Sequence, residues 1–112
     1  MRIAIPLGED GLASHVGRCR EFALVDVDPH TGIVQGRRWT SAPTPGRGRV
    51  PKWLADQGAQ VIIAGGMERR TRGLLADRGI RVVVDAPAET PGRLVAAYLA
   101  GRLQPGAEFA DL

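Results

Sequence analysis

The side chains best suited to chemistry lie close together, between residues 11 and 22. This segment holds the single cysteine of the chain, Cys19, one of its two histidines, His15, and also Ser14 and Arg18. It joins two strand-like runs and is too long for a tight hairpin turn, and long ordered loops are uncommon unless they carry function. Imidazole and thiolate groups bind borderline and soft metals. We therefore predict a functional site in this segment, with His15 and Cys19 as candidate metal ligands.

Two such residues form an incomplete set of metal ligands. A closed structural zinc site needs four protein ligands, and the chain has no second cysteine. One or two protein ligands, completed by the sulfides of a cluster or by a second subunit, fit better. The residues alone leave two other interpretations open. Cys19 could be a nucleophile activated by His15, although no third orienting group is evident. Alternatively, Cys19 is a small core residue and His15 a hydrogen-bonding loop residue.

The charge of the chain is unevenly distributed. The formal net charge is +3 and the sequence pI is about 10.0. No acidic residue lies between Asp28 and Asp56, whereas that stretch holds Arg37, Arg38, Arg47, Arg49 and Lys52. A segment of one sign favours an anionic partner, or is simply a solvated surface. One alternative function is therefore a nucleic-acid-binding or phosphate-binding module that uses the basic segment 37–52. Nucleic acid is the less favoured partner, since only 4% of the residues are aromatic and single-strand binders use aromatic stacking.

The elements that must position these residues follow from periodicity and turn signals. Strands are predicted at residues 1–7, 21–28, 33–40, 60–66 and 80–85, and helices at residues 50–57, 68–78 and 90–101. The strand at 33–40 is expected at a sheet edge, because Arg37 and Arg38 are adjacent. The first half is antiparallel, whereas alternation of helix and strand in the second half requires parallel strands. We therefore predict an α/β protein with a mixed five-stranded sheet and helices on both faces.

A glycine pair follows the predicted strand at 60–66. Gly65 and Gly66 could form an anion-binding corner before the next helix, or a tight turn that lets a helix pack closely. The carboxyl ends of central parallel strands are where open α/β sheets bind ligands. The glycine pair and the segment between residues 11 and 22 are therefore expected at the same end of the sheet.

The length of 112 residues corresponds to one domain. We place it at residues 1–103, followed by a C-terminal tail at residues 104–112 that lacks periodicity, as is typical of disordered ends. A single cysteine excludes an internal disulfide. Neither a signal peptide nor an apolar run of membrane-spanning length is evident, so a cytoplasmic protein with no membrane partner is expected.

Several of these motifs together resemble a known family. Residues 1–6, the run Ser14-His15-Val16-Gly17-Arg18-Cys19 and the strand from Phe22 resemble the dinitrogenase iron–molybdenum cofactor biosynthesis family, which includes NifX, NafY and the C-terminal domain of NifB. The glycine pair, Gly79-Ile80 and Tyr98-Leu99-Ala100-Gly101 extend the resemblance to residues 1–103 in the right order. The family usually has Phe where this chain has Val16, and small residues where it has the sequence Met-Glu-Arg-Arg at 67–70.

The resemblance implies a fold and a function. The fold would be a three-layer α/β/α arrangement with a ribonuclease H-like motif, sheet order 3-2-1-4-5 and strand 2 antiparallel. Members bind anionic metal–sulfur clusters, such as the iron–molybdenum cofactor or, in orange proteins, a molybdenum–copper sulfide. This chain would thus be a non-catalytic carrier of a cluster of molybdenum with iron or copper. A cluster donor or acceptor protein would be its partner, and the chain would be a monomer or a weak homodimer.

The resemblance and the residue chemistry together give a set of expected site residues. The cofactor-binding residues are Ser14, His15, Gly17, Arg18, Arg47, Arg49, Gly65 and Gly66, and the metal ligands are His15 and Cys19. The arginines would neutralise charge, and backbone N–H groups near the glycines would donate hydrogen bonds. A hydrolase that exploits the ribonuclease H-like topology ranks last, because Asp26, Asp28 and Asp85 are not expected to converge.

Overall fold

The computed structural model describes residues 1–9, 11–44, 46 and 48–103, so Arg47 and the predicted tail at 104–112 lie outside the described residues. The elements are β1 (Arg2–Gly8), β2 (Gly11–Leu12), the 3₁₀ helix η1 (Val16–Arg18), β3 (Glu21–Val27), β4 (Val34–Ser41), α1 (Arg49–Asp56), β5 (Val61–Ile63), α2 (Arg69–Asp77), β6 (Arg81–Val83) and α3 (Pro91–Leu99). Each predicted strand and helix is present. The strands predicted at 60–66 and 80–85 are shorter than expected and end at Ile63 and Val83.

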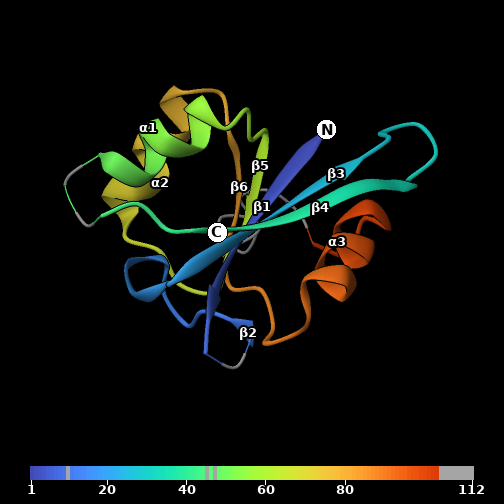
Figure 1. Ribbon diagram of the computed structural model, residues 1–112, viewed down its shortest axis with the longest axis horizontal. Coiled ribbons are helices and arrows are strands. Elements are labelled where there is room, and N and C mark those ends of the chain that lie inside the picture. The colour runs from blue at the N-terminus through green and yellow to red at the C-terminus, as the bar shows by residue number, and fades with distance from the viewer. Residues whose placement is uncertain (10, 45, 47, 104–112) are drawn as a thin grey trace, which may run out of the picture.

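The strands form one mixed sheet in the order β4-β3-β1-β5-β6 (Figure 1). β3 runs antiparallel to β1, and β4 antiparallel to β3, whereas β5 is parallel to β1 and β6 to β5. This confirms the order 3-2-1-4-5 with the second strand antiparallel. The prediction of five strands missed β2, which pairs with the end of β1 through Leu7↔Leu12 and Gly8↔Gly11. Its two residues are too few for a periodicity signal, and Gly11 has a φ of 112° that favours glycine.

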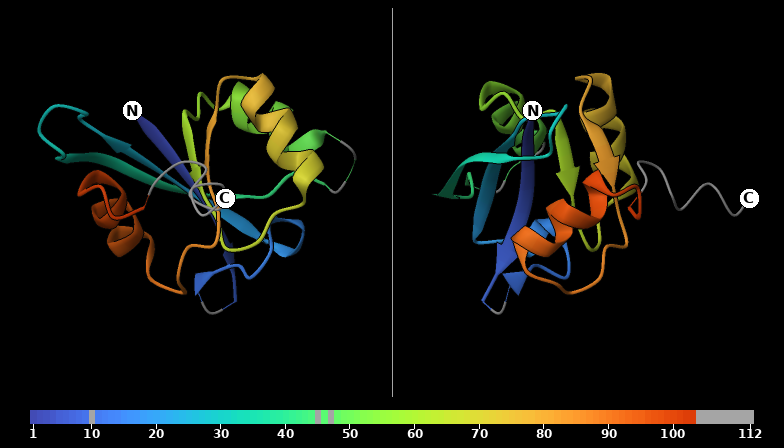
Figure 2. Two further views of the ribbon diagram at one scale, coloured as in Figure 1. Left: turned by 180° about the vertical axis from the view of Figure 1, so that it is seen from behind. Right: turned by 90° about the vertical axis from the view of Figure 1, so that its right-hand side faces the viewer.

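Helices cover both faces of the sheet, which confirms the three-layer α/β/α prediction (Figure 2). Ile3 and Ile5 of β1 belong to a buried cluster with Leu94 of α3. Ala4, between them in the chain, belongs to the cluster of the other face with Leu54 of α1. Successive side chains of a strand point to opposite faces, so a strand buried on both sides is apolar at every position.

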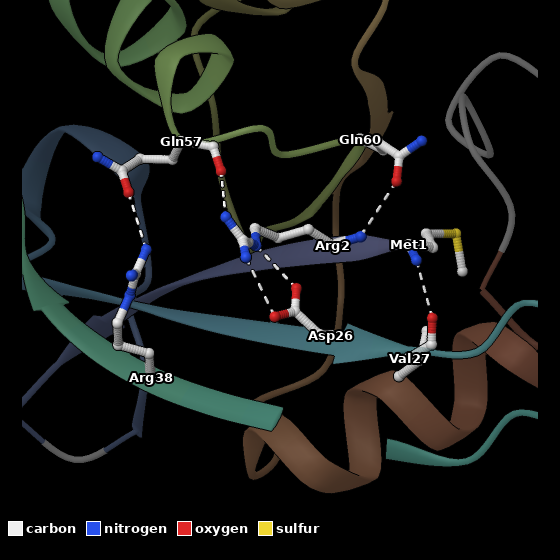
Figure 3. A network of polar contacts seen from close by, with 7 residues as sticks. All are labelled: Met1, Arg2, Asp26, Val27, Arg38, Gln57 and Gln60. Carbon is white, nitrogen blue, oxygen red and sulfur yellow. Dashed lines mark hydrogen bonds and ion pairs between the residues drawn. The ribbon is translucent and has the colours of Figure 1, made fainter. Parts of the chain in front are cut away.

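A polar network ties β1, β3 and α1 together at the amino ends of the parallel strands (Figure 3). The guanidinium of Arg2 donates to Asp26 Oδ1 at 2.7 Å and to Oδ2 at 3.1 Å, and also to the backbone oxygen of Gln57. The backbone N–H of Arg2 donates to Gln60 Oε1 at 3.2 Å. The ion pair holds the pKa of Asp26 below its ordinary value, because Arg2 donates hydrogen bonds to the charged carboxylate.

Among the described residues, no helix is both long enough and apolar enough to cross a membrane.

Candidate functional site

The loop after β2 and the glycine pair after β5 are directly joined by backbone hydrogen bonds. The Val16 N–H donates to Gly66 O at 2.9 Å, and the Gly66 N–H donates to Ser14 O at 2.9 Å. His15 and Gly66 thereby form an isolated parallel bridge. The prediction that these two segments share one end of the sheet is confirmed.

The two glycines permit this close approach. A Cβ atom on Gly66 would lie 2.8 Å from Ser14 O, and one on Gly65 would lie 3.0 Å from Ala13 O. Any other residue would push the loop away, so close packing explains why both positions are glycine. The Gly66 N–H was expected to donate to an anion, but it is already bonded to Ser14. Participation of Ser14, Gly65 and Gly66 in ligand binding stays a prediction.

His15 caps the short helix η1 with its side chain. Its Nδ1 atom accepts the Gly17 N–H at 3.0 Å, so this N–H too is used within the loop. Because the Nδ1 lone pair accepts a hydrogen, a neutral ring carries its proton on Nε2. Nε2 is then a hydrogen-bond donor. A metal bond at Nε2 would require loss of that proton, or its transfer to Nδ1 with loss of the Gly17 bond.

A cavity of about 460 Å³ lies beside His15. We call it the His15 cavity. Four segments line it: the η1 loop, the loop after β4, and the starts of α1 and α2. The lining residues are His15, Val16, Gly17, Cys19, Ala42, Pro43, Gly46, Gly48, Val50, Pro51, Glu68, Arg70, Thr71 and Leu74. Its size and its mixture of apolar and polar groups are typical of small-ligand sites. A neighbouring cavity of about 550 Å³ is lined by His15, Gly17, Arg18 and Glu68.

Two helices begin at the His15 cavity. Gly48 precedes α1 and Glu68 precedes α2, and neither residue makes a side-chain capping hydrogen bond. Neither helix has an acidic residue in its first turn. A helix amino terminus carries a partial positive charge and unsatisfied N–H groups, which favour anions. The dipoles of the two helices therefore favour an anion in the same cavity, although at the start of α1 the Arg49 N–H already donates to Gly46 O at 3.2 Å and Pro51 has no N–H.

The charged residues of the cavities include one expected arginine, Arg18, and two residues that were not expected, Glu68 and Arg70. Arg70 lines the His15 cavity, Arg18 lines the neighbouring one, and Glu68 lines both. Arg49 is exposed in the first turn of α1 and lines neither cavity. Arg70, Glu68 and Thr71 were missed as site residues, although they directly follow the glycine pair. Their position shortly after a glycine pair, at the carboxyl end of a parallel strand, was the signal that could have identified them.

Cys19 lines the His15 cavity but is half-buried and contacts the apolar core below α1. Burial raises the pKa of its thiol to about 11, so the side chain is a neutral thiol near pH 7. A thiolate–metal bond would form only if the metal displaced this proton. In the part of the chain that the structure describes, no group of three or more His, Cys, Asp and Glu side chains could hold a metal ion. The assignment of His15 and Cys19 as metal ligands stays a prediction.

The carboxylates considered for a hydrolase do not meet. Asp26 is paired with Arg2 at the amino end of β1. Asp85 follows β6 at the other end, where its N–H donates to Gly65 O at 2.7 Å. This separation gives no support to two-metal hydrolysis, which needs clustered carboxylates.

Comparison with known proteins identifies the family. The crystal structure of PH0822 is 28% identical in sequence, covers 94% of each chain and superposes with a TM-score of 0.82. The apo form of the orange protein from Desulfovibrio gigas is 25% identical over 93% of this chain and 91% of that one, with a TM-score of 0.75. A crystal structure from Methanocaldococcus jannaschii, at 15% identity and a TM-score of 0.77 over 93% and 92% of the two chains, shares the fold alone. The search of curated proteins finds no match. A family model described as dinitrogenase iron–molybdenum cofactor matches residues 1–101, and the chain belongs to this family.

Proposed function

We propose that the chain binds and carries an anionic metal–sulfur cluster in the His15 cavity, and that it catalyses no reaction. The observation that carries this proposal is the convergence of two helix starts, neither with a side-chain cap, on one cavity beside His15. Family membership supports it, since the family takes its description from the iron–molybdenum cofactor. The cluster is cargo in this proposal. It would contain molybdenum with iron or copper.

The lining suits an anion whose outer atoms are sulfides. Sulfide is a weak hydrogen-bond acceptor with a polarizable surface, so it tolerates apolar neighbours such as Val16 and Leu74, which line the cavity. Arg70 and the two helix starts would balance its negative charge. His15 would donate its Nε2–H to a cluster sulfur, since Nδ1 is held by Gly17.

In this proposal, Glu68 would lower the affinity of the cavity for the cluster. Its carboxylate lines the cavity and would repel an anion. A carrier must release its cargo as well as bind it, and a like charge at the entrance lowers affinity without changing shape. We propose that Glu68 favours release. The Glu68→Gln variant should then bind the cluster more tightly than the wild type.

The proposed partner is a protein that donates or accepts the cluster. The chain would act in the cytoplasm as a monomer or a weak homodimer. Arg18 would contact cargo or partner through the neighbouring cavity.

Reconstitution tests the cargo. The full chain is incubated with tetrathiomolybdate, alone or with Cu(I) or Fe(II), and visible absorption is followed through gel filtration. The wild type should retain a chromophore. Arg70→Gln and His15→Asn should each weaken binding about tenfold, the cost of one charge-assisted or buried hydrogen bond. Arg81→Gln, at an exposed arginine on β6, is the matched control and should bind normally. Failure of the wild type to retain any chromophore, or equal retention by all variants, would overturn the proposal.

The alternative function has less support. The basic residues of segment 37–52 are spread over β4 and α1, and two of them have partners. Arg38 donates to Gln57 Oε1 at 2.9 Å, and Lys52 pairs with Asp56 at 3.2 Å. Titration with an oligonucleotide at several salt concentrations tests this function. Affinity that falls steeply with salt would support it.

A further inference from the structure

Within the described part of the chain, no strand pairs with the outer side of β4, which is therefore an open sheet edge. β4 is the last strand on its side of the sheet order, and Figure 1 shows it at the margin of the sheet. Its length of eight residues exceeds that of β6, the three-residue strand at the other edge. Open edges of this length are unusual unless they are protected or pair with something.

The residues that face outward can be identified from the hydrogen-bond pattern. The Ala42 N–H donates to Arg20 O at 2.9 Å, so these two residues form a hydrogen-bonded pair. Pairs alternate along an antiparallel ladder. With Leu24 opposite Arg38 and Ala23 opposite Trp39, Arg38 bonds toward β3, whereas Trp39 directs its N–H and C=O away from the sheet. The same alternation turns the backbone groups of Arg37 and Ser41 outward.

The side chains along this edge define a complementary partner. Trp39 is 50% exposed and Val34 is 37% exposed, an unusual exposure for large apolar side chains in a strand. Arg37 and Arg38 are exposed between them. The sequence from residue 29 to residue 55 contains no Asp or Glu. A partner that complements this edge would supply apolar side chains and negative charge.

We propose that β4 accepts an extended segment of another protein as an added strand, and that this segment carries acidic side chains alternating with apolar ones. Main-chain hydrogen bonds to residues 37, 39 and 41 would give affinity. Successive side chains of β4 point to opposite faces, so the apolar side chains of the segment would contact Trp39 on one face and its acidic side chains would pair with Arg38 on the other. A second copy of this chain fits less well. Antiparallel pairing of two β4 strands over their full length would place arginines opposite arginines, which is destabilising.

The position of this edge links it to the cavity. β4 ends at Ser41, and the next two residues, Ala42 and Pro43, line the His15 cavity. A partner strand added to β4 would therefore extend toward residues that line the cavity. The proposal concerns docking only and stands whether or not the cavity holds a cluster.

A synthetic peptide tests the docking. The probe is an eight-residue capped peptide that alternates Glu and Val, and its control replaces each Glu with Lys. Both are titrated into the ¹⁵N-labelled full chain without cluster. The acidic peptide should shift the amide signals of residues 37, 39 and 41 and slow their hydrogen exchange, and raised salt should weaken the effect. Equal effects from the Lys peptide, or shifts confined to β6 or to the cavity, would overturn the proposal.

Two variants locate the interaction. The double substitution Arg37→Glu/Arg38→Glu should weaken binding of the acidic peptide about tenfold, whereas Arg81→Glu on the opposite edge strand should leave it unchanged. Trp39→Pro removes one outward N–H and should abolish protection. If either variant unfolds, Arg38→Gln removes the charge that pairs with the acidic side chains, with a smaller expected loss. Concentration-dependent dimerisation through β4 in sedimentation experiments would show that a second copy is the occupant, and would overturn the acidic-partner proposal.

Discussion

Gly66 is the residue at which the two halves of the site touch. We expect Gly66→Ala to destabilise the protein by about 1–3 kcal/mol, because a Cβ there would lie 2.8 Å from Ser14 O and 3.2 Å from His15 Cδ2. The loop must shift to relieve both contacts, so the capping bond between His15 and Gly17 should weaken as well. Urea unfolding measures the first effect, and the NMR signal of the Gly17 amide reports the second.

Gly73 provides the matched control. It lies inside α2, and a Cβ there would meet nothing within 4 Å. Gly73→Ala should therefore stabilise the protein by about 0.5–1 kcal/mol through helix propensity. If both substitutions had the same effect on stability, close approach at Gly66 would not be the reason for glycine there.

A single hydrogen bond also restricts the chemistry that the His15 side chain can perform. The residue type is compatible with a metal ligand, a base or a hydrogen-bond donor. The bond from Gly17 to Nδ1 selects the donor form at Nε2 for a neutral ring. The reactivity of Cys19 is restricted by burial, which raises the pKa of its thiol to about 11 and leaves the thiol protonated near pH 7. In the proposed function, both side chains would therefore make non-covalent contact with a pre-formed anion, whereas capture of a bare metal ion would require each to lose a proton or a hydrogen bond.

At the scale of elements, the proposed site depends on the starts of α1 and α2, both of which line the cavity. Arg18, Arg47 and Arg49 were predicted to neutralise the charge of the cargo. Arg18 lines the neighbouring cavity, Arg49 lines neither cavity, and Arg47 lies outside the described residues. The helix starts and Arg70 lie at the cavity instead. Backbone dipoles are fixed by the fold, so they do not need to be reorganised when an anion binds.

The ion pair that ties β1 to β3 predicts a pH dependence of stability. The pKa of Asp26 in the folded protein is lowered by Arg2, so its contribution is present above the unfolded pKa of about 3.9 and is lost as pH falls through the folded value. The side chains are 33% and 40% exposed, which limits the contribution to about 1 kcal/mol or less. Asp26→Asn should lower the free energy of unfolding at pH 7 by that amount, as measured with urea.

The difference between Asp26→Asn and the wild type should shrink when the same measurement is made near pH 3. Glu89→Gln is the control. Its ion pair with Arg93 is longer, at 3.4 Å, and is local, because Glu89 directly precedes Thr90, the N-cap of the helix that contains Arg93. A difference for Asp26→Asn that stays constant from pH 7 to pH 3 would contradict the electrostatic explanation.

At the scale of the whole molecule, the sheet separates two cores, and only one of them lies beneath the cavity. Leu75 of α2 is 0% exposed in the core on the α1 and α2 side, and Leu94 of α3 is 1% exposed in the core on the other side. Leu75→Ala and Leu94→Ala should each cost about 2–5 kcal/mol. Only Leu75→Ala should weaken anion binding, because α2 helps to form the cavity.

Calorimetric titration with tetrathiomolybdate, at a temperature where both variants remain folded by circular dichroism, makes this comparison. Similar losses of affinity in both variants would mean that the cavity depends on the whole fold rather than on one layer. Unchanged affinity in both would mean that the start of α2 does not contribute.

The sequence by itself determined the elements and their layering. Apolar residues at nearly every position of the first strand indicated cover on both faces, and adjacent arginines at 37 and 38 indicated an edge. The family resemblance supplied the strand order, which the sheet confirms. Clustering of rare residue types also pointed to the loop around His15, and this loop does line the cavities.

Only the tertiary structure decided how the site is assembled. Periodicity reports which face of an element is buried, but it carries no information on which backbone atoms from distant segments meet. The bonds between Gly66 and the loop, and the presence of Arg70 and Glu68 at the cavity, depend on such meetings. The short strand β2 could not be predicted from the sequence for the same reason. Its two residues show no periodicity, and they form a strand only because they pair with the end of β1.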